Sequence, residues 1–145
     1  MAVCSTYGFP GTNVPLSDLL TTGSTSLNCY ISGYTQTGNQ VTVTIYASGN
    51  NTALATITGG GNGGAITAMS NDTFSISSGN TYYAVVSSTQ PQGQTPRVLY
   101  NYDSLSYGTT TYAGTVSLCM EDTPSGGDCD FNDAVITISW TLYAG

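Results

Sequence analysis

The feature that most constrains the fold of this chain is an alternation of β-branched or aromatic residues with polar residues, interrupted at short intervals by Gly, Asn and Pro. An alternation with a period of two is typical of strands that bury one face, and the interrupting residues favour turns. The pattern predicts strands near residues 27–32, 40–47, 53–58, 73–77, 81–88, 96–102, 112–120 and 134–142.

These short and evenly spaced strands predict an all-β fold, an antiparallel β-sandwich of about eight to nine strands. Helix signals are nearly absent, and residues 15–20 would form one turn at most. A chain of 145 residues is expected to be a single domain over residues 1–145. The last predicted strand, residues 134–142, is apolar on one face and contains the only Trp, Trp140. We therefore expect this strand to be central in its sheet and to hold the loop before it rigidly.

An acidic stretch comes directly before that strand. Five of the eight acidic residues lie in it, and they are Glu121, Asp122, Asp128, Asp130 and Asp133. If the loop is extended, side chains two residues apart point the same way, so Asp128, Asp130 and Asn132 would converge. Crowded carboxylates repel one another unless a cation lies between them, and a set of oxygen ligands suits calcium. We therefore predict a calcium site in this loop, with Glu121 returning to it across the turn at residues 124–127.

The spacing of this loop excludes an EF-hand. Asp128, Asp130 and Asn132 match the first three ligand positions of that motif, but Asp133 stands where the turn requires Gly. Ser139 stands where the bidentate Glu belongs, and a predicted strand follows the loop instead of a helix. The remaining alternative to a calcium site is an acidic surface loop that holds no ion.

The charge of the chain excludes several other classes of partner. The net charge is -7, His is absent, and Arg97 is the only basic residue. Nucleic acids and anionic membranes both require a basic face, so we expect no binding to nucleic acid. No apolar run approaches the ~20 residues that span a bilayer, so we expect no membrane insertion. The polar composition predicts a secreted or cell-surface protein, although residues 1–20 contain no recognisable signal peptide.

The chain has four cysteines, and an even number in such a composition favours disulfides. We favour a bond between Cys119 and Cys129, which would brace the acidic loop. A second bond between Cys4 and Cys29 would then tie the N-terminal arm to the first strand. The other pairings remain open at this point, as does the alternative of free thiols.

The stretch that runs from Glu121-Asp122 through Asp128-x-Asp130-Phe131-Asn132-Asp133-Ala134-Val135 resembles the calcium-mediated, fucose- and mannose-binding bacterial lectin family. The similarity extends more weakly back to residue 27. The resemblance implies a carbohydrate-binding lectin with one or two calcium ions as cofactor. It also implies that sugar hydroxyls coordinate the calcium directly.

The resemblance also assigns roles to individual residues. One ion would be held by Glu121, Asp128, Asp130 and Asp133, and the second by Asp130, Asn132 and Asp133. Asp122 matches a position that hydrogen-bonds the sugar, and the loop that determines specificity would be Gln36, Thr37 and Gly38. The terminal carboxylate of Gly145 would reach the calcium of a partner subunit, which implies a homo-oligomer.

One departure from the family supports a different function. Five residues, 123–127, separate Asp122 from Asp128, and this spacing is longer than in the sugar-binding lectins. It is similar to that of uncharacterised extracellular calcium-binding β-domains. The alternative function is therefore a structural or adhesive β-domain, or a filament subunit, in which calcium only staples the loop.

A glycosidase is a third possibility, and we do not favour it. Such an enzyme needs a carboxylic acid with a raised pKa opposite a carboxylate, whereas a bound calcium would lower the pKa of both groups. The acidic stretch therefore predicts binding and not catalysis.

Overall fold

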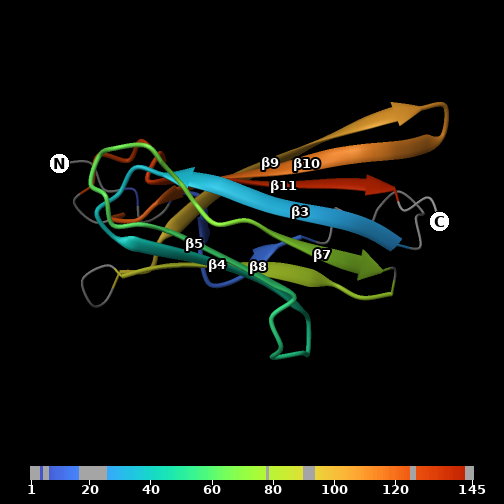
Figure 1. The fold of residues 1–145 in the computed structure, drawn as a ribbon, viewed down its shortest axis with the longest axis horizontal. Helices are drawn as coiled ribbons and strands as arrows, with labels where there is room; N and C mark the ends of the chain where they lie inside the picture. The colour runs from blue at the N-terminus through green and yellow to red at the C-terminus, as the bar shows by residue number, and fades with distance from the viewer. Residues whose placement is uncertain are drawn as a thin grey trace.

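The computed structural model describes residue 4 and residues 7–16, 26–77, 79–89, 94–124 and 127–142. Within these residues the chain forms eleven strands in two antiparallel sheets, with no helix (Figure 1). The predicted all-β sandwich is confirmed, and each predicted strand is present. The strands at 40–47 and 134–142 have the predicted bounds, and the other six have shifted ends. The three additional strands have two residues each.

The larger sheet has seven strands. They are β1 (Phe9–Pro10), β9 (Arg97–Tyr107), β10 (Thr110–Glu121), β11 (Ala134–Leu142) and β3 (Ser26–Thr35), with β6 (Thr67–Ala68) and β7 (Asp72–Ser77) both paired to β3. The smaller sheet consists of β2 (Val14–Pro15), β8 (Tyr82–Ser88), β4 (Gln40–Ala47) and β5 (Ala55–Gly60), in that order.

Strand β11 lies between β10 and β3, so the prediction that it is central is confirmed. Val116 of β10 is paired with Ile138, which is paired in turn with Ile31 of β3. All three side chains are buried in the core between the sheets. Burial of each such side chain contributes about 1.5–3 kcal/mol, so this row fixes β11 firmly in the sheet.

The hairpin of β9 and β10 reaches beyond the other strands at one end of the sandwich (Figure 1). Its pairing continues from Glu121 opposite Arg97 to Thr110 opposite Tyr107. The guanidinium of Arg97 donates hydrogen bonds to the backbone oxygens of Tyr7 and Gly8, and thereby holds the segment before β1. The only basic side chain therefore binds backbone carbonyls next to the sheet.

The one helical turn that the sequence allowed is not confirmed where it can be checked. Pro15 belongs to strand β2, and residues 17–20 lie outside the described residues. Within the described chain, no helix is long and apolar enough to cross a membrane.

Candidate functional site

Three strand ends meet at one rim of the larger sheet. Strand β10 ends at Glu121, β11 begins at Ala134, and Ala134 is paired with Thr35 at the end of β3. The loop between β10 and β11 is fixed at its far end, because the Asp133 amide donates to the Met120 oxygen at 3.1 Å. The acidic loop therefore stands on a rigid base, as a metal site requires.

The acidic side chains of this loop converge in two groups. In each group, one oxygen from every carboxylate lies within 4.8 Å of the others. The first group is Glu121, Asp128 and Asp130, and the second is Glu121, Asp122 and Asp133. Glu121 belongs to both groups, so it is the centre of the cluster.

The loop reaches this arrangement by a different backbone route from the one predicted. Cys129 has φ of 62° and Phe131 has φ of 56°, so the loop is not extended as we expected. A left-handed conformation costs a non-Gly residue roughly 1–2 kcal/mol. Burial of the Phe131 ring helps to hold Phe131 in this conformation. Asn132 does not stand free, because its Nδ2 donates to Oδ2 of Asp130 at 2.6 Å.

The environment of the Glu121 carboxylate is the feature of the site that best fits a bound cation. Its side chain is 1% exposed, and its Oε1 accepts a hydrogen bond from the Thr123 amide at 3.0 Å. Its Oε2 is buried and, within the described chain, has no hydrogen-bond partner. A buried carboxylate oxygen without a partner is costly, and a cation among oxygen ligands would satisfy it. The residues at this rim therefore fit calcium.

The crowding of negative charge in this loop affects the pKa of Asp133. Its side chain is half-buried, and its Oδ2 accepts a hydrogen bond from the Asp122 amide at 2.8 Å. Burial first, and then the negative charges of Asp122 and Glu121, raise the pKa of Asp133 to about 7, although the hydrogen bond from the Asp122 amide lowers it. The calcium-free cluster therefore holds a proton near neutral pH, which a cation would displace.

The predicted sugar-contacting loop lies directly beside the acidic loop. Thr37 donates a hydrogen bond from its hydroxyl to Oδ2 of Asp122. The Gln36 amide donates to the Asp133 backbone oxygen at 2.9 Å, and Gly38 is exposed. The structure therefore brings the Gln36 to Gly38 segment next to Asp122, which was assigned to the sugar, and Asp133, which was assigned to calcium. Gly145 lies outside the described residues.

Three further residues take part in the site. Asn39 donates from Nδ2 to Oδ2 of Asp122 at 3.0 Å, and the Thr123 hydroxyl donates to its Oδ1 at 2.7 Å. Thr123 could have been suspected from its position in the acidic stretch. The third residue, Cys4, is distant in sequence, and only the fold brings it to the loop.

The predicted disulfide pairings are wrong. Cys4 is bonded to Cys129, while Cys29 and Cys119 are free. The alternation of β10 explains the error at Cys119, because Leu118 and Met120 point into the core and Cys119 points away from it. Cys29 is buried on the inner face of β3, and burial raises the pKa of its thiol to about 12. The acidic loop is therefore braced by the N-terminal segment.

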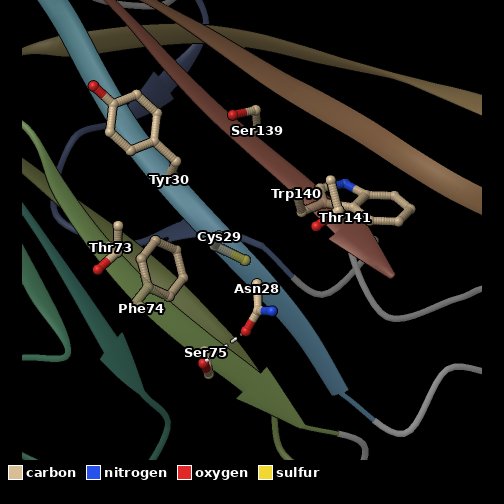
Figure 2. Close-up of a pocket in the computed structure, with 9 residues that line it drawn as sticks. All are labelled: Asn28, Cys29, Tyr30, Thr73, Phe74, Ser75, Ser139, Trp140 and Thr141. Carbon is tan, nitrogen blue, oxygen red and sulfur yellow. Dashed lines mark hydrogen bonds between the residues drawn. The ribbon is translucent and has the colours of Figure 1, made fainter. Parts of the chain in front are cut away.

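A groove of about 590 Å³ lies on another part of the larger sheet, across β3, β7 and β11. Figure 2 shows its lining residues, which include Tyr30, Ser139 and Thr141. Among these residues, the Ser75 hydroxyl donates a hydrogen bond to Oδ1 of Asn28. None of its nine lining side chains is charged. The groove therefore does not compete with the acidic rim as a cation site.

A β-sandwich with a crowded acidic loop at the rim of its central strands fits the class of calcium-binding β-sandwich lectins. The family described as Fucose-binding lectin II (PA-IIL) matches residues 23–142 of this chain, and the chain belongs to that family. Proteins of this family are calcium-dependent, sugar-binding lectins, a non-enzymatic class. The suspected family is thus confirmed. A comparison with curated proteins gave no match.

Solved structures of bacterial lectins share the fold. The C-terminal domain of the BC2L-C lectin from Burkholderia cenocepacia has a TM-score of 0.60 and 17% identity, covering 83% of this chain and 97% of that one. The high-affinity mannose-binding lectin of Ralstonia solanacearum has a TM-score of 0.58 and 22% identity, covering 83% and 91%. The Chromobacterium violaceum lectin CV2L, solved in complex with alpha-methyl-fucoside, has a TM-score of 0.55 and 18% identity, and the match covers 83% of this chain and 91% of that one.

Proposed function

We propose that this protein binds carbohydrate through calcium held at the acidic rim. The observation that carries the proposal is the buried Oε2 of Glu121, which lacks a hydrogen-bond partner within the described chain, in a carboxylate that belongs to both groups of converging acids. When bound, calcium accepts six to eight oxygens, roughly, so an ion at an open rim can take vicinal sugar hydroxyls as ligands. Every protein ligand that we assign is an oxygen.

The proposed ligand sets are those that the family resemblance implies, and they draw on both of the carboxylate groups described above. Glu121, Asp128, Asp130 and Asp133 would hold one ion, and the close approach of the first three supports this set. Asp130, Asn132 and Asp133 would hold a second. For this, Asn132 would present its side-chain oxygen instead of the amide hydrogens that now face Asp130. The second ion is therefore the part of the proposal that depends most on rearrangement.

We propose that the sugar is contacted beside the ions by the loop of Gln36, Thr37 and Gly38 and by the adjoining Asp122. Gly38 is exposed and Gln36 is partly exposed, so both are accessible from solvent. The sugars that we propose are fucose- or mannose-like, since solved lectins of the same fold bind mannose or were solved with alpha-methyl-fucoside. No catalytic step is proposed.

The proposal extends to the setting of the protein. We propose a secreted or cell-surface lectin, and the disulfide between Cys4 and Cys129 supports an oxidising compartment. We also propose a homo-oligomer in which Gly145 reaches a partner subunit's calcium. Several sites on one assembly would bind a multivalent glycan with a higher avidity than the affinity of any single site.

A structural β-domain in which calcium only staples the loop is the second candidate. The observation that favours it is the longer stretch between Asp122 and Asp128. Within its described residues, the Gly127 amide donates a hydrogen bond to the Thr123 oxygen at 2.9 Å. In this case calcium would stabilise the protein, and no sugar would bind.

The experiment is retention on fucose and mannose resins in calcium, with release by EDTA. Asp130→Ala should abolish both calcium binding in calorimetry and retention on the resin. The matched control is Asp103→Ala, which removes an exposed acid from strand β9 and should change neither. Calcium binding without retention on either resin or on a glycan array would favour the structural β-domain. Retention that survives EDTA would contradict the proposed function.

A further inference from the structure

A trough crosses five neighbouring strands of the larger sheet, on the face that points away from the core. It consists of two hollows, the groove of about 590 Å³ shown in Figure 2 and a hollow of about 320 Å³ across β9, β10 and β11. The two hollows share Ser139, Trp140 and Thr141 of β11. Both volumes lie within the range of about 300–1,000 Å³ that is usual for ligand sites.

The strand register makes the two hollows continuous. Trp140 is paired with Gly114 of β10 on one side and with Cys29 of β3 on the other, and Cys29 is paired with Phe74 of β7. The side chains of Trp140, Cys29 and Phe74 are buried, so the outer face of the sheet presents only their backbone. This row of paired residues is therefore the floor of the trough.

The walls are the residues just before and just after the floor on each strand, whose side chains point outward. One wall consists of the paired residues Asp103, Thr115, Ser139, Tyr30 and Thr73. The other consists of Leu105, Ala113, Thr141, Asn28 and Ser75. From the usual strand geometry, the trough is about 19 Å long and about 7 Å from wall to wall. These proportions suit one extended chain.

The lining indicates a neutral and hydroxyl-rich ligand. Within the described chain, Asp103 is the only charged residue that lines the trough, so no positive charge is present to attract an anionic chain. Ser and Thr hydroxyls and the Asn28 amide can both donate and accept hydrogen bonds. The Tyr30 ring is 43% exposed and offers a flat apolar surface to the C–H groups of a sugar ring.

The sheet itself argues against a peptide in the trough. Strands β10, β11 and β3 are each paired on both sides, so the backbone groups of the floor are already used in the sheet. A peptide strand therefore cannot add to the sheet here through main-chain hydrogen bonds. Recognition in the trough depends on side chains, and a glycan presents hydroxyl groups along its whole length.

We propose that this trough is a second glycan-binding site, which takes a neutral, linear oligosaccharide of about four sugar units and needs no calcium. Ser139 lies five residues along β11 from Ala134, which places the trough roughly 17 Å from the acidic rim. A monosaccharide would fill about one strand spacing and touch few of the wall side chains. The trough therefore does not retain the protein on fucose or mannose resin.

The experiment is calorimetric titration in EDTA, which removes any calcium from the rim, with cellohexaose and mannohexaose as probes. At least one of the two should bind, and the corresponding disaccharide should bind about tenfold or more weakly. Hexagalacturonic acid, an anionic chain of the same length, should not bind. Binding of neither neutral hexasaccharide would overturn the proposal, as would equal binding of the anionic one.

Two variants place the bound chain in the trough. Tyr30→Ala should weaken binding of the hexasaccharide about tenfold or more, because it removes the exposed ring. Ser139→Leu should do the same by filling the point where the two hollows meet. The matched control is Tyr34→Ala, on the same face of β3 and 39% exposed but outside the trough, which should bind as the parent does. Equal loss in the control would contradict the proposed location.

A second copy of the chain is the other occupant that these variants test. If Tyr30→Ala or Ser139→Leu dissociates an oligomer in sedimentation velocity, the trough is a subunit contact and the proposal is overturned. The calcium site is tested separately. A parent protein that is not retained on either monosaccharide resin in calcium would contradict the proposed function, and the titrations in EDTA would still decide the role of the trough.

Discussion

Cys4 and Cys129 form a disulfide across a sequence separation of 125 residues, and Cys129 lies between the proposed ligands Asp128 and Asp130. The Cys4 amide also donates a hydrogen bond to the Pro124 oxygen at 3.0 Å. The N-terminal segment therefore holds the acidic loop at two points, one near its start and one among the ligands. This relationship makes the shape of the ion site dependent on a covalent bond from the far end of the chain.

Loss of this disulfide should weaken both the fold and calcium binding. In Cys4→Ser, the free energy of unfolding should fall by about 2–5 kcal/mol, because a long loop is no longer closed in the unfolded chain. Calcium affinity should fall about tenfold or more, since the ion must then order the loop itself. Calorimetric titration and chemical denaturation measure the two effects. Cys119→Ser removes a free thiol and serves as the control; equal calcium affinity in both variants would sink the prediction.

Glu121→Gln should change stability and calcium binding in opposite directions. In the calcium-free protein, Gln removes a buried negative charge beside other carboxylates, and its amide can donate to them. The free energy of unfolding should therefore rise by about 1–3 kcal/mol. Calcium affinity should fall, because the ion loses a charged ligand that belongs to both groups of acids. Melting temperatures with calcium and with EDTA test this.

The control for this change is Asp103→Asn, at an exposed acid on β9. It removes the same charge from the protein, so it isolates the effect of net charge. If Glu121→Gln melts at a lower temperature than the parent in EDTA, Oε2 of Glu121 has a hydrogen-bond partner in the calcium-free parent protein, and the prediction is wrong.

The stability of the calcium-free protein should fall as pH rises through the range set by Asp133. Burial, with the charges of Asp122 and Glu121, raises the pKa of Asp133 from 3.8 to about 7. The folded protein therefore keeps a proton that the unfolded chain releases, and this group's contribution to stability declines from about pH 4 to about pH 7. Thermal unfolding in EDTA across this range measures the decline.

Asp133→Asn should flatten that decline in the calcium-free protein. Calcium binds the ionised form, so calcium uptake near pH 6, roughly, should release protons, which calorimetry in buffers of different ionisation enthalpy detects. If the parent and Asp133→Asn show the same pH dependence in EDTA, Asp133 is not the group responsible.

Strand positions could be predicted from sequence because alternation is a local property of each strand. The pattern in residues 134–142 even indicated that β11 is central, since it carries one continuous apolar face. Strands β1, β2 and β6 have two residues each, so they have no period to detect. The outer part of β9, where Leu105 and Tyr107 are exposed, lacks a buried face and therefore lacks the alternation that a sandwich strand shows.

The convergence of the acids could also be predicted, because five carboxylates within a short loop have few ways to avoid one another. The path of the loop could not. Cys129 and Phe131 adopt left-handed conformations that their residue types do not favour, and a disulfide and a buried ring hold them there. Pairing of cysteines likewise depends on tertiary contacts, and closeness in sequence suggested the wrong partner for Cys129.

The packing of Trp140 gives a test of the sheet that is independent of the ion site. A Cβ added at Gly114 of β10 would lie 2.5 Å from the Cε2 and Cζ2 atoms of the Trp140 ring, so the ring or the strand would have to move. Gly114→Ala should therefore lower the free energy of unfolding by about 1–3 kcal/mol. The control is Gly64→Ala, where an added Cβ meets nothing within 4 Å. Chemical denaturation of both variants measures the difference, and equal stability would mean that the indole is not held against β10 as described. Calcium affinity should be unchanged in both, since Trp140 lies near the end of β11 and the acidic loop precedes its start.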